Sequence, residues 1–224
     1  MLSVLYVDDD AVVIDKPSGL AFQPGEGVTR SLVELAEQEL GFKPYPVHRL
    51  DKDTSGCVLL ARSPRAAARF APLFEEKVRG VLKAYGAVVG GVMEKPFGVI
   101  EDDVRVRGVA KGALTRWRLD EALGDFSLLE VELGTGRMHQ IRIHLASIGH
   151  PIVADDRHGD FAGNKAWAAA YGARRLMLWA ARLELPVEPP IKVSAPPPPH
   201  VAAFLERLRN GTAPPAGPVP GEPA

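Results

Sequence analysis

The chain has 224 residues, of which 46% are hydrophobic and 25% charged, and its formal net charge is −1. This length can hold one sizeable core, and the composition excludes both an intrinsically disordered chain and an integral membrane protein. We therefore expect one folded domain over residues 1–209, followed by a disordered Pro/Gly-rich tail over residues 210–224.

No targeting or membrane segment is visible in the sequence. The N-terminus lacks a basic region and reaches the acidic residues Asp8 to Asp10 too soon for a signal peptide, and no apolar run approaches a bilayer span. Cys57 is the only cysteine, so no internal disulfide can form. We therefore expect a cytoplasmic protein, for which a monomer suffices.

The first half of the chain is predicted to open with a β-hairpin. Apolar runs within residues 4–14 flank an Asp-rich turn, which is typical of a hairpin. Helical spacing over residues 31–40 predicts an amphipathic helix, and residues 56–61 are typical of a buried strand. A second helix begins after Ser63, and Pro72 is expected to kink or split it.

The second half is predicted to be rich in strands. Period-two alternation from Arg79 to Ala87 places Lys83 and Tyr85 on one strand face. The other elements expected are two strands, a helix, a strand, an extended proline-rich linker and a last helix, over residues 112–120, 126–133, 137–148, 176–185, 186–199 and 201–209. His139 and Arg142 are neighbours in the first of these helices, because they are three residues apart.

The balanced charge does not by itself indicate a nucleic-acid binder, which usually carries a basic surplus. Residues 105–118 and 137–144 are nevertheless locally basic. Solvated surface residues are the commoner explanation of such stretches. A nucleic-acid-binding face would therefore have to be local.

The densest group of polar and ionisable residues, 47–56, lies at the start of the predicted buried strand. Loops at strand edges often carry catalytic groups. A solvated turn in which Asp53 or Ser55 acts as a local cap explains the same composition. Polarity alone does not decide between these two interpretations.

Metal and nucleotide sites are not favoured. His139 and His144 are five residues apart, whereas two metal ligands on one helix face need a spacing of three or four. The segment 134–137 lacks the lysine and the spacing of a phosphate-binding loop. We therefore expect neither a metal nor a cofactor.

Three other reactive positions have more ordinary explanations. Ser55 could be a hydrolase nucleophile, but no glycine precedes it by two residues to complete an elbow motif. Asp155 and Asp156 could bind Mg²⁺, but adjacent carboxylates after a strand are more often loop surface. Cys57 lies in an apolar strand and is expected in the core.

Four motifs follow one another along the chain. They are Lys16-Pro17-Ser18-Gly19, His48-Arg49-Leu50-Asp51 with Thr54-Ser55-Gly56, the alternation Arg79-x-Val81-x-Lys83-x-Tyr85-x-Ala87, and residues 136–145 with 149–152. Together they resemble the RluA-type pseudouridine synthases, which modify uridines in large-subunit rRNA and tRNA. The resemblance extends from Leu5 to about Leu208. Four ordered motifs are far more specific than one.

The resemblance implies three catalytic residues. Asp51 would be the nucleophile that attacks the target nucleotide while the uracil is detached, turned and rejoined through carbon. Arg142 would pair with Asp51 and keep it ionised, since an adjacent guanidinium lowers the pKa of a carboxylate. Tyr85 would stack on the uracil and assist loss of the proton at carbon 5. This isomerisation requires no metal, redox group or group donor.

The resemblance also implies how RNA is held. Arg49 would enter the space left by the flipped nucleotide, and Leu178 would pack under the base. His48 belongs to the same motif as Arg49, and Lys83 shares a strand face with Tyr85, so both are candidates for substrate binding. A uridine in a loop is less costly to extrude than a paired one, which favours a loop as the substrate.

Three positions depart from the family pattern and are expected to alter the pocket rim. Met138 stands where Thr is usual, His158 where Tyr is common, and Trp179 where His is frequent. We also expect the chain to begin directly at the catalytic domain, without the small RNA-binding domain that many relatives carry in front. Target choice would then rest on the catalytic domain.

These observations predict an α+β fold, in which helices flank a mixed, largely antiparallel sheet and an RNA-binding cleft crosses one face. The predicted function is the isomerisation of specific uridines in structured RNA, with 23S rRNA as the expected partner and neither a membrane nor a metal involved. The alternatives are a tRNA-specific pseudouridine synthase, a non-catalytic RNA-binding protein that keeps the fold, and a hydrolase that uses Ser55.

Overall fold

The computed structural model describes residues 1–75, 80–106 and 108–211. Its centre is a ten-stranded sheet in the order β1-β2-β4-β11-β5-β10-β9-β6, with β3 paired to β4 and β12 to β11. The strands are β1 Ser3–Val7, β2 Ala11–Lys16, β3 Tyr45–Pro46, β4 Ser55–Ala61, β5 Leu82–Gly90, β6 Phe97–Ile100, β7 Asp103–Val106, β8 Val109–Gly112, β9 Thr115–Leu123, β10 Phe126–Leu133, β11 Leu178–Leu185 and β12 Ile191–Ser194. Strands β7 and β8 form a separate hairpin.

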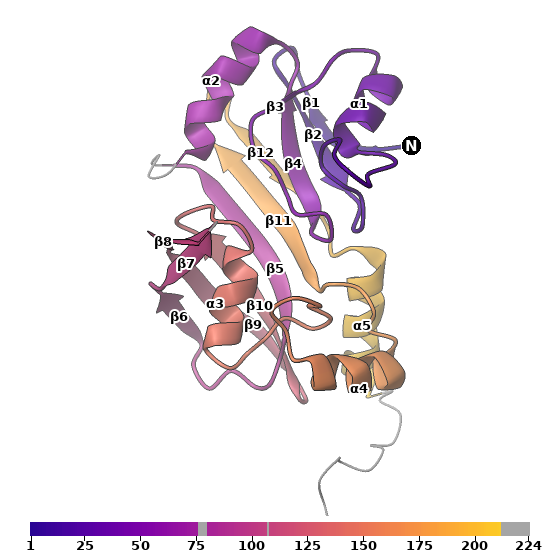
Figure 1. Cartoon of the computed structure of the whole chain (residues 1–224), viewed down its shortest axis with the longest axis vertical. Coiled ribbons are helices and arrows are strands. Elements are labelled where there is room, and N and C mark those ends of the chain that lie inside the picture. Colours follow the sequence, from indigo (N-terminus) through magenta and orange to yellow (C-terminus); the bar gives the residue numbers. More distant parts are fainter. Residues whose placement is uncertain (76–79, 107, 212–224) are drawn as a thin grey trace, which may run out of the picture.

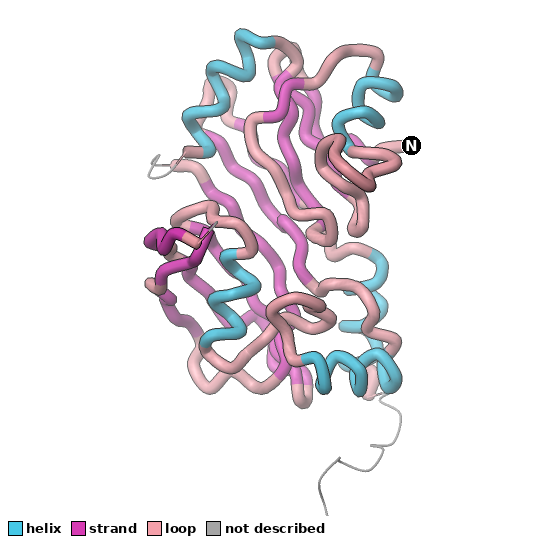
Figure 2. The backbone as a smooth tube through the Cα atoms, viewed as in Figure 1, coloured by secondary structure: helices cyan, strands magenta, loops and turns pink. Residues whose placement is uncertain are grey.

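The helices are α1 Leu32–Leu40, α2 Pro64–Phe74, α3 Gln140–Ser147, α4 Phe161–Tyr171 and α5 Pro199–Arg209. In Figure 1, α1 and α2 lie beside the first strands, α3 lies in front of β9 and β10, and α4 and α5 lie at the opposite end. Of the strand pairs in the sheet, β4 and β11 run parallel and the others antiparallel. The predicted α+β fold with a mixed, mostly antiparallel sheet is confirmed (Figure 2). None of the helices in the described residues is long and apolar enough to cross a membrane.

Local signals fix the helices of the first half. Ser31 and Glu34 form a reciprocal capping box at the start of α1, and Gly41 ends the helix in the left-handed conformation. The Ser63 hydroxyl accepts the Ala66 N–H at the start of α2. Pro72 does not split α2, which continues to Phe74. Pro72 lies in the last turn of α2, so any distortion that it causes falls at the end of the helix.

The second half departs from expectation at α3 and in the predicted linker, and it contains strands β6 to β8 and helix α4, which were not predicted. Helix α3 begins three residues later than predicted, because His139 adopts a left-handed conformation that no helix continues through. The segment predicted as a proline-rich linker contains β12, which pairs with β11 and buries Ile191 and Val193. Arg79 and residues 212–224, which include most of the predicted tail, lie outside the described residues.

The apolar core consists of two clusters, one in each half of the sheet. The first contains residues of β5, β10, α3 and α5, and the second contains residues of β2, β4, α1 and α2. Strand β11 contributes Leu178 to the first cluster and Ala180 to the second, and Tyr85 of β5 packs against both. The junction of the two clusters therefore lies at the middle of the sheet, where β11 and β5 pair.

Candidate active site

A pocket of about 320 Å³ opens at this junction. It lies between the loop before β4, the strands β5 and β11, and the beginning of α3. The sequence-predicted residues that line it are Arg49, Asp51, Tyr85, Arg142 and Leu178. The first and last of these residues, Arg49 and Leu178, are more than 120 positions apart, so the fold brings distant segments of the chain together at one pocket.

The Lys16–Gly19 turn holds the loop that carries Asp51. Lys16 is fully buried, and its Nζ donates to the carbonyl oxygens of Pro17, Leu20 and Lys52 at 3.0, 2.8 and 2.8 Å. Gly19 N–H donates to the same Lys52 carbonyl at 3.0 Å. Burial lowers the pKa of Lys16 to about 8. The Lys16–Gly19 motif thus supports the loop of the motif that contains Asp51.

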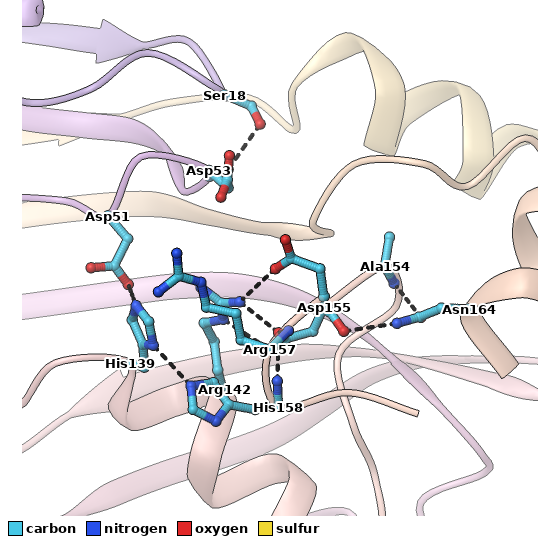
Figure 3. A network of polar contacts seen from close by, with 11 residues as sticks. Ser18, Asp51, Asp53, His139, Arg142, Ala154, Asp155, Arg157, His158 and Asn164 are labelled. Carbon is cyan, nitrogen blue, oxygen red and sulfur yellow. Dashed lines mark hydrogen bonds and ion pairs between the residues drawn. The ribbon is translucent and has the colours of Figure 1, made fainter. Parts of the chain in front are cut away.

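The hydroxyl of Ser18 adds a further contact to that loop, donating to the Asp53 carbonyl at 2.8 Å (Figure 3). Asp51 itself projects toward α3. Its Oδ2 lies 3.7 Å from Nε2 of His139, and its side chain is 27% exposed. The carboxylate therefore remains accessible from the pocket, while hydrogen bonds hold the two residues that follow Asp51.

Arg142 does not form the predicted ion pair with Asp51. Its Nε and Nη2 bind Asp155 at 2.8 and 2.5 Å, and Nη2 also lies 3.3 Å from Asp156. Arg142 and Asp155 are almost completely buried, so the bidentate geometry compensates for their desolvation. Burial alone would lower the pKa of Arg142, but the hydrogen bond and charge of Asp155 raise it above its ordinary value. Asp51 is close enough to raise it further. The guanidinium thus supplies positive charge to the pocket without direct contact with Asp51.

The expectation that Asp155 and Asp156 are loop surface is correct for Asp156 alone. The Asp156 side chain is 77% exposed, whereas that of Asp155 is 1% exposed. Hydrogen bonds from Arg142 and from the N–H groups of His158 and Arg157 hold the pKa of Asp155 below its usual range, although burial opposes this shift. The sequence feature that could have indicated the burial of Asp155 is its position directly after the apolar run 151–154.

Tyr85 and Leu178 form the apolar part of the pocket. Leu178 is buried, and it faces the pocket from β11, opposite Ala87 of β5. Burial, and then the negative charge of Asp51, raise the pKa of Tyr85 above its ordinary value, so the phenol stays protonated. A neutral aromatic ring and a leucine side chain provide surfaces on which a base can stack.

Two predicted substrate-binding residues do not line this pocket. His48 stacks on Phe74 with ring centroids 4.0 Å apart, and its Nε2 accepts the Leu59 N–H at 2.9 Å. Burial, and then the charge of Lys83, lower the pKa of His48 to about 3, which fits a neutral structural histidine. Lys83 lines the neighbouring pocket together with Arg116 and Glu132.

The three departures from the family pattern lie in different places. Met138 is 57% exposed and lines the pocket, as expected for a rim residue. His158 contacts His139 instead, with 2.8 Å between His139 Nδ1 and His158 Nε2 (Figure 3). Trp179 does not line the pocket, because its ring occupies the space over Gly86, where an added Cβ would lie 2.1 Å from the ring.

The histidines considered as metal ligands are separated. His144 is buried and bonded to the Thr115 hydroxyl and the Asp102 carbonyl at 2.9 and 3.1 Å, whereas His139 faces the pocket. Among the described residues, no group of three or more His, Cys, Asp or Glu side chains is arranged to hold a metal ion.

Residues 10–147 match the RNA pseudouridylate synthase family. Ribosomal large subunit pseudouridine synthase C of Vibrio cholerae is 33% identical over 92% of this chain and 69% of its own length. The tRNA pseudouridine synthase C of Salmonella typhi is 33% identical over 83% of this chain and 80% of its own length. The solved structure of human RNA pseudouridylate synthase domain containing 4 is 28% identical, covers 92% of this chain and 93% of its own, and superposes with a TM-score of 0.78.

These similarities define the class of protein, which is an isomerase that modifies RNA. Within this class the chain belongs to the RNA pseudouridylate synthase family, and it is an RNA pseudouridine synthase.

Proposed function

We propose that the chain converts specific uridines of 23S rRNA into pseudouridine, with Asp51 as the nucleophile. The observation that carries this proposal is the position of Asp51, Tyr85 and Arg142 around one pocket. A pocket of about 320 Å³ is at the small end of the range for organic ligands, which suits a single everted base.

In the proposed reaction, the Asp51 carboxylate attacks the nucleotide and the bond between ribose and the ring nitrogen breaks. The uracil turns while it is held between Tyr85 and Leu178, and carbon 5 bonds to the ribose as the bond between Asp51 and the ribose breaks. The proton on carbon 5 then leaves, and the ring nitrogen released from the ribose gains one. Substrate and product are isomers, so the atoms balance. Arg142 lines the same pocket and supplies positive charge there without direct contact with Asp51. The protonated Tyr85 supplies a neutral stacking surface.

The exposed Arg49 is the candidate for contact with the RNA around the everted nucleotide. It lines the pocket mouth beside Asp51. A guanidinium can stack on bases and bind phosphate oxygens, which fits a side chain that fills the space of the missing base. The proposal includes a cytoplasmic monomer, because rRNA is matured beside ribosomes and one chain supplies the whole pocket.

The identity of the RNA is tested by mapping. Carbodiimide-based mapping of pseudouridine in rRNA and tRNA is compared between cells that contain and lack the protein. We expect a position in 23S rRNA to lose its signal. Loss confined to a tRNA position would replace the proposed substrate by the one for which the Salmonella typhi relative is named.

The nucleophile is tested with Asp51→Asn and a matched loss of charge elsewhere, Asp125→Asn, in an exposed turn. We expect Asp51→Asn to bind the substrate RNA with unchanged affinity and to form no product, and Asp125→Asn to form product at the normal rate. Product formation by Asp51→Asn would refute the catalytic role. Absence of product from the unmodified chain on every RNA tested would favour a non-catalytic RNA-binding protein.

The hydrolase alternative requires a reactive Ser55. The Ser55 hydroxyl is buried, lacks a hydrogen-bond partner within the described residues, and does not line the pocket. Nothing in its surroundings activates it as a nucleophile. We expect Ser55→Ala to leave pseudouridine formation intact, and a complete loss of activity without loss of folding would revive the alternative.

A further inference from the structure

His139 lines the pocket and has an unusual backbone conformation. It immediately precedes α3 and adopts a left-handed backbone conformation with φ of 57°. This conformation costs about 1–2 kcal/mol for a residue other than glycine. Its side chain does not cap the helix. The backbone therefore directs the ring into the pocket rather than toward the helix terminus.

Both nitrogens of the His139 ring face a partner. Nε2 lies 3.7 Å from Oδ2 of Asp51, and Nδ1 lies 2.8 Å from Nε2 of His158. The second distance is a well-formed hydrogen bond, whereas the first needs a movement of about half an ångström to become one. The His139 side chain is only 13% exposed, so water offers it few competing contacts.

Burial keeps His139 neutral. Burial is the largest effect that lowers the pKa of His139, the Asp51 carboxylate opposes it, and the positive charges of Arg142 and Arg157 act in the same direction as burial. Burial also lowers the pKa of His158. Each ring therefore carries a single N–H at neutral pH.

With one N–H on each ring, two arrangements of the histidine pair are possible. If His158 donates to Nδ1 of His139, the proton of His139 is on Nε2 and faces the Asp51 carboxylate. If His139 donates instead, its unprotonated Nε2 faces the same carboxylate, and two lone pairs oppose each other. Electrostatics selects the first arrangement.

We propose that His139 is a positioning residue that holds the Asp51 carboxylate through Nε2–H, and that His158 fixes this tautomer by donating to Nδ1. The proposal rests on the proposed role of Asp51 as the nucleophile. It gives the His158 side chain a role in the site, and Asp155 holds the His158 backbone in place. The His158 N–H donates to Oδ1 of Asp155 at 3.0 Å, and the same Oδ1 accepts from Arg142. One buried carboxylate thus orients both the guanidinium and the histidine pair.

The tautomer of His139 is the first test, and it is independent of catalysis. Long-range ¹H–¹⁵N spectra of the full chain distinguish a protonated Nδ1 from a protonated Nε2. We expect the His139 signals of the unmodified protein to show Nε2–H, and those of His158→Phe to show a mixture of the two tautomers. An Nδ1–H tautomer in the unmodified protein would overturn the proposal.

Single-turnover kinetics give the second test. His158→Phe keeps an aromatic ring but removes the donor, whereas the hydroxyl of His158→Tyr and the amide of His158→Gln restore one. We expect the rate to fall roughly 10- to 100-fold in His158→Phe, with RNA affinity within about twofold of normal, because misoriented groups lose this much in comparable sites. At least one of the donor variants should recover most of the rate. The control is His200→Phe, because His200 bonds to the Leu176 carbonyl outside the pocket.

The two proposals fail in different ways. Full activity in Asp51→Asn, with the Nε2–H tautomer still present, would refute the nucleophile alone. A normal rate in His158→Phe, or donor variants as slow as His158→Phe although equally stable, would refute the positioning role while Asp51 remained the nucleophile.

Discussion

Arg142 and Asp155 form a bidentate ion pair that joins the first turn of α3 to the turn after residues 151–154. Oδ1 of Asp155 also accepts the N–H groups of Arg157 and His158 at 2.9 and 3.0 Å (Figure 3). One side chain therefore fixes the position of the guanidinium and the fold of the turn. The pocket depends on a carboxylate that does not line it.

The first prediction concerns the loss of this carboxylate charge. Asp155→Asn leaves the buried Arg142 with only the exposed Asp156 as a counter-ion, so we expect a loss of about 3–5 kcal/mol in the free energy of unfolding. Urea unfolding at pH 7 measures this loss, and product formation by the remaining folded enzyme should fall as Arg142 and His158 shift. Asp156→Asn is the matched control, because Asp156 is exposed and should change stability by less than about 1 kcal/mol. Equal effects of the two variants would contradict the role given to Asp155.

The same pair predicts how stability depends on pH. The pKa of Asp155 is lower in the folded state than in the unfolded chain, where it is near 3.8. The unfolded chain therefore binds more protons in this range, and stability decreases as the pH falls. We expect the contribution of Asp155 to be complete well above pH 4 and to be lost as the pH falls below that value. Urea unfolding from pH 7 to pH 3 should show a smaller decrease in Asp155→Asn than in the unmodified chain.

The Lys16 ammonium makes a separate prediction about the Asp51 loop. Lys16→Met keeps the apolar stem but removes the ammonium donor from the carbonyl groups of Pro17, Leu20 and Lys52, of which only that of Lys52 keeps a second donor, the Gly19 N–H. We expect a loss of roughly 2–4 kcal/mol in stability and a slower reaction, since buried acceptors without partners are costly. Lys165→Met, on the exposed face of α4, is the control and should behave like the unmodified chain. A fully active, fully stable Lys16→Met would show that the loop does not need this support.

Features determined by neighbouring residues were predictable from the sequence. The capping residues Ser31 and Ser63 and the left-handed Gly41 mark helix ends through contacts within a few positions. Motif resemblance added Asp51 and Tyr85, whose shared position at one pocket agrees with expectation. Each of these predictions depends either on residues a few positions apart or on a recognisable motif.

Contacts between distant segments were not predictable in the same way. Arg142 was assigned to Asp51, but Asp155 is the partner, because a turn 13 residues later folds back onto α3. His48 belongs to the same motif as Asp51, yet it packs on Phe74 and away from the pocket. A motif shows which residues belong to a site, whereas the direction of each side chain depends on the segments that pack against it.

The parallel pairing of β4 with β11 leads to the last prediction, because it brings the Asp51 loop close to Leu178. Gly56 of β4 has φ of 100°, and a Cβ added there would lie 2.3 Å from the Ala180 carbonyl oxygen of β11. Gly56→Ala therefore combines backbone strain with a clash that neither strand can avoid without separating. We expect a loss of more than about 3 kcal/mol in stability, as for other severe backbone and packing defects.

Gly149→Ala separates the two effects of that substitution. Gly149 has φ of 83° with nothing within 4 Å of an added Cβ, so it reports backbone strain alone, which is worth about 1–2 kcal/mol. Urea unfolding of both variants gives the contribution of close strand approach as their difference. If Gly56→Ala were no less stable than Gly149→Ala, β4 and β11 could move apart at little cost, and the pocket between Asp51 and Leu178 would not depend on their spacing.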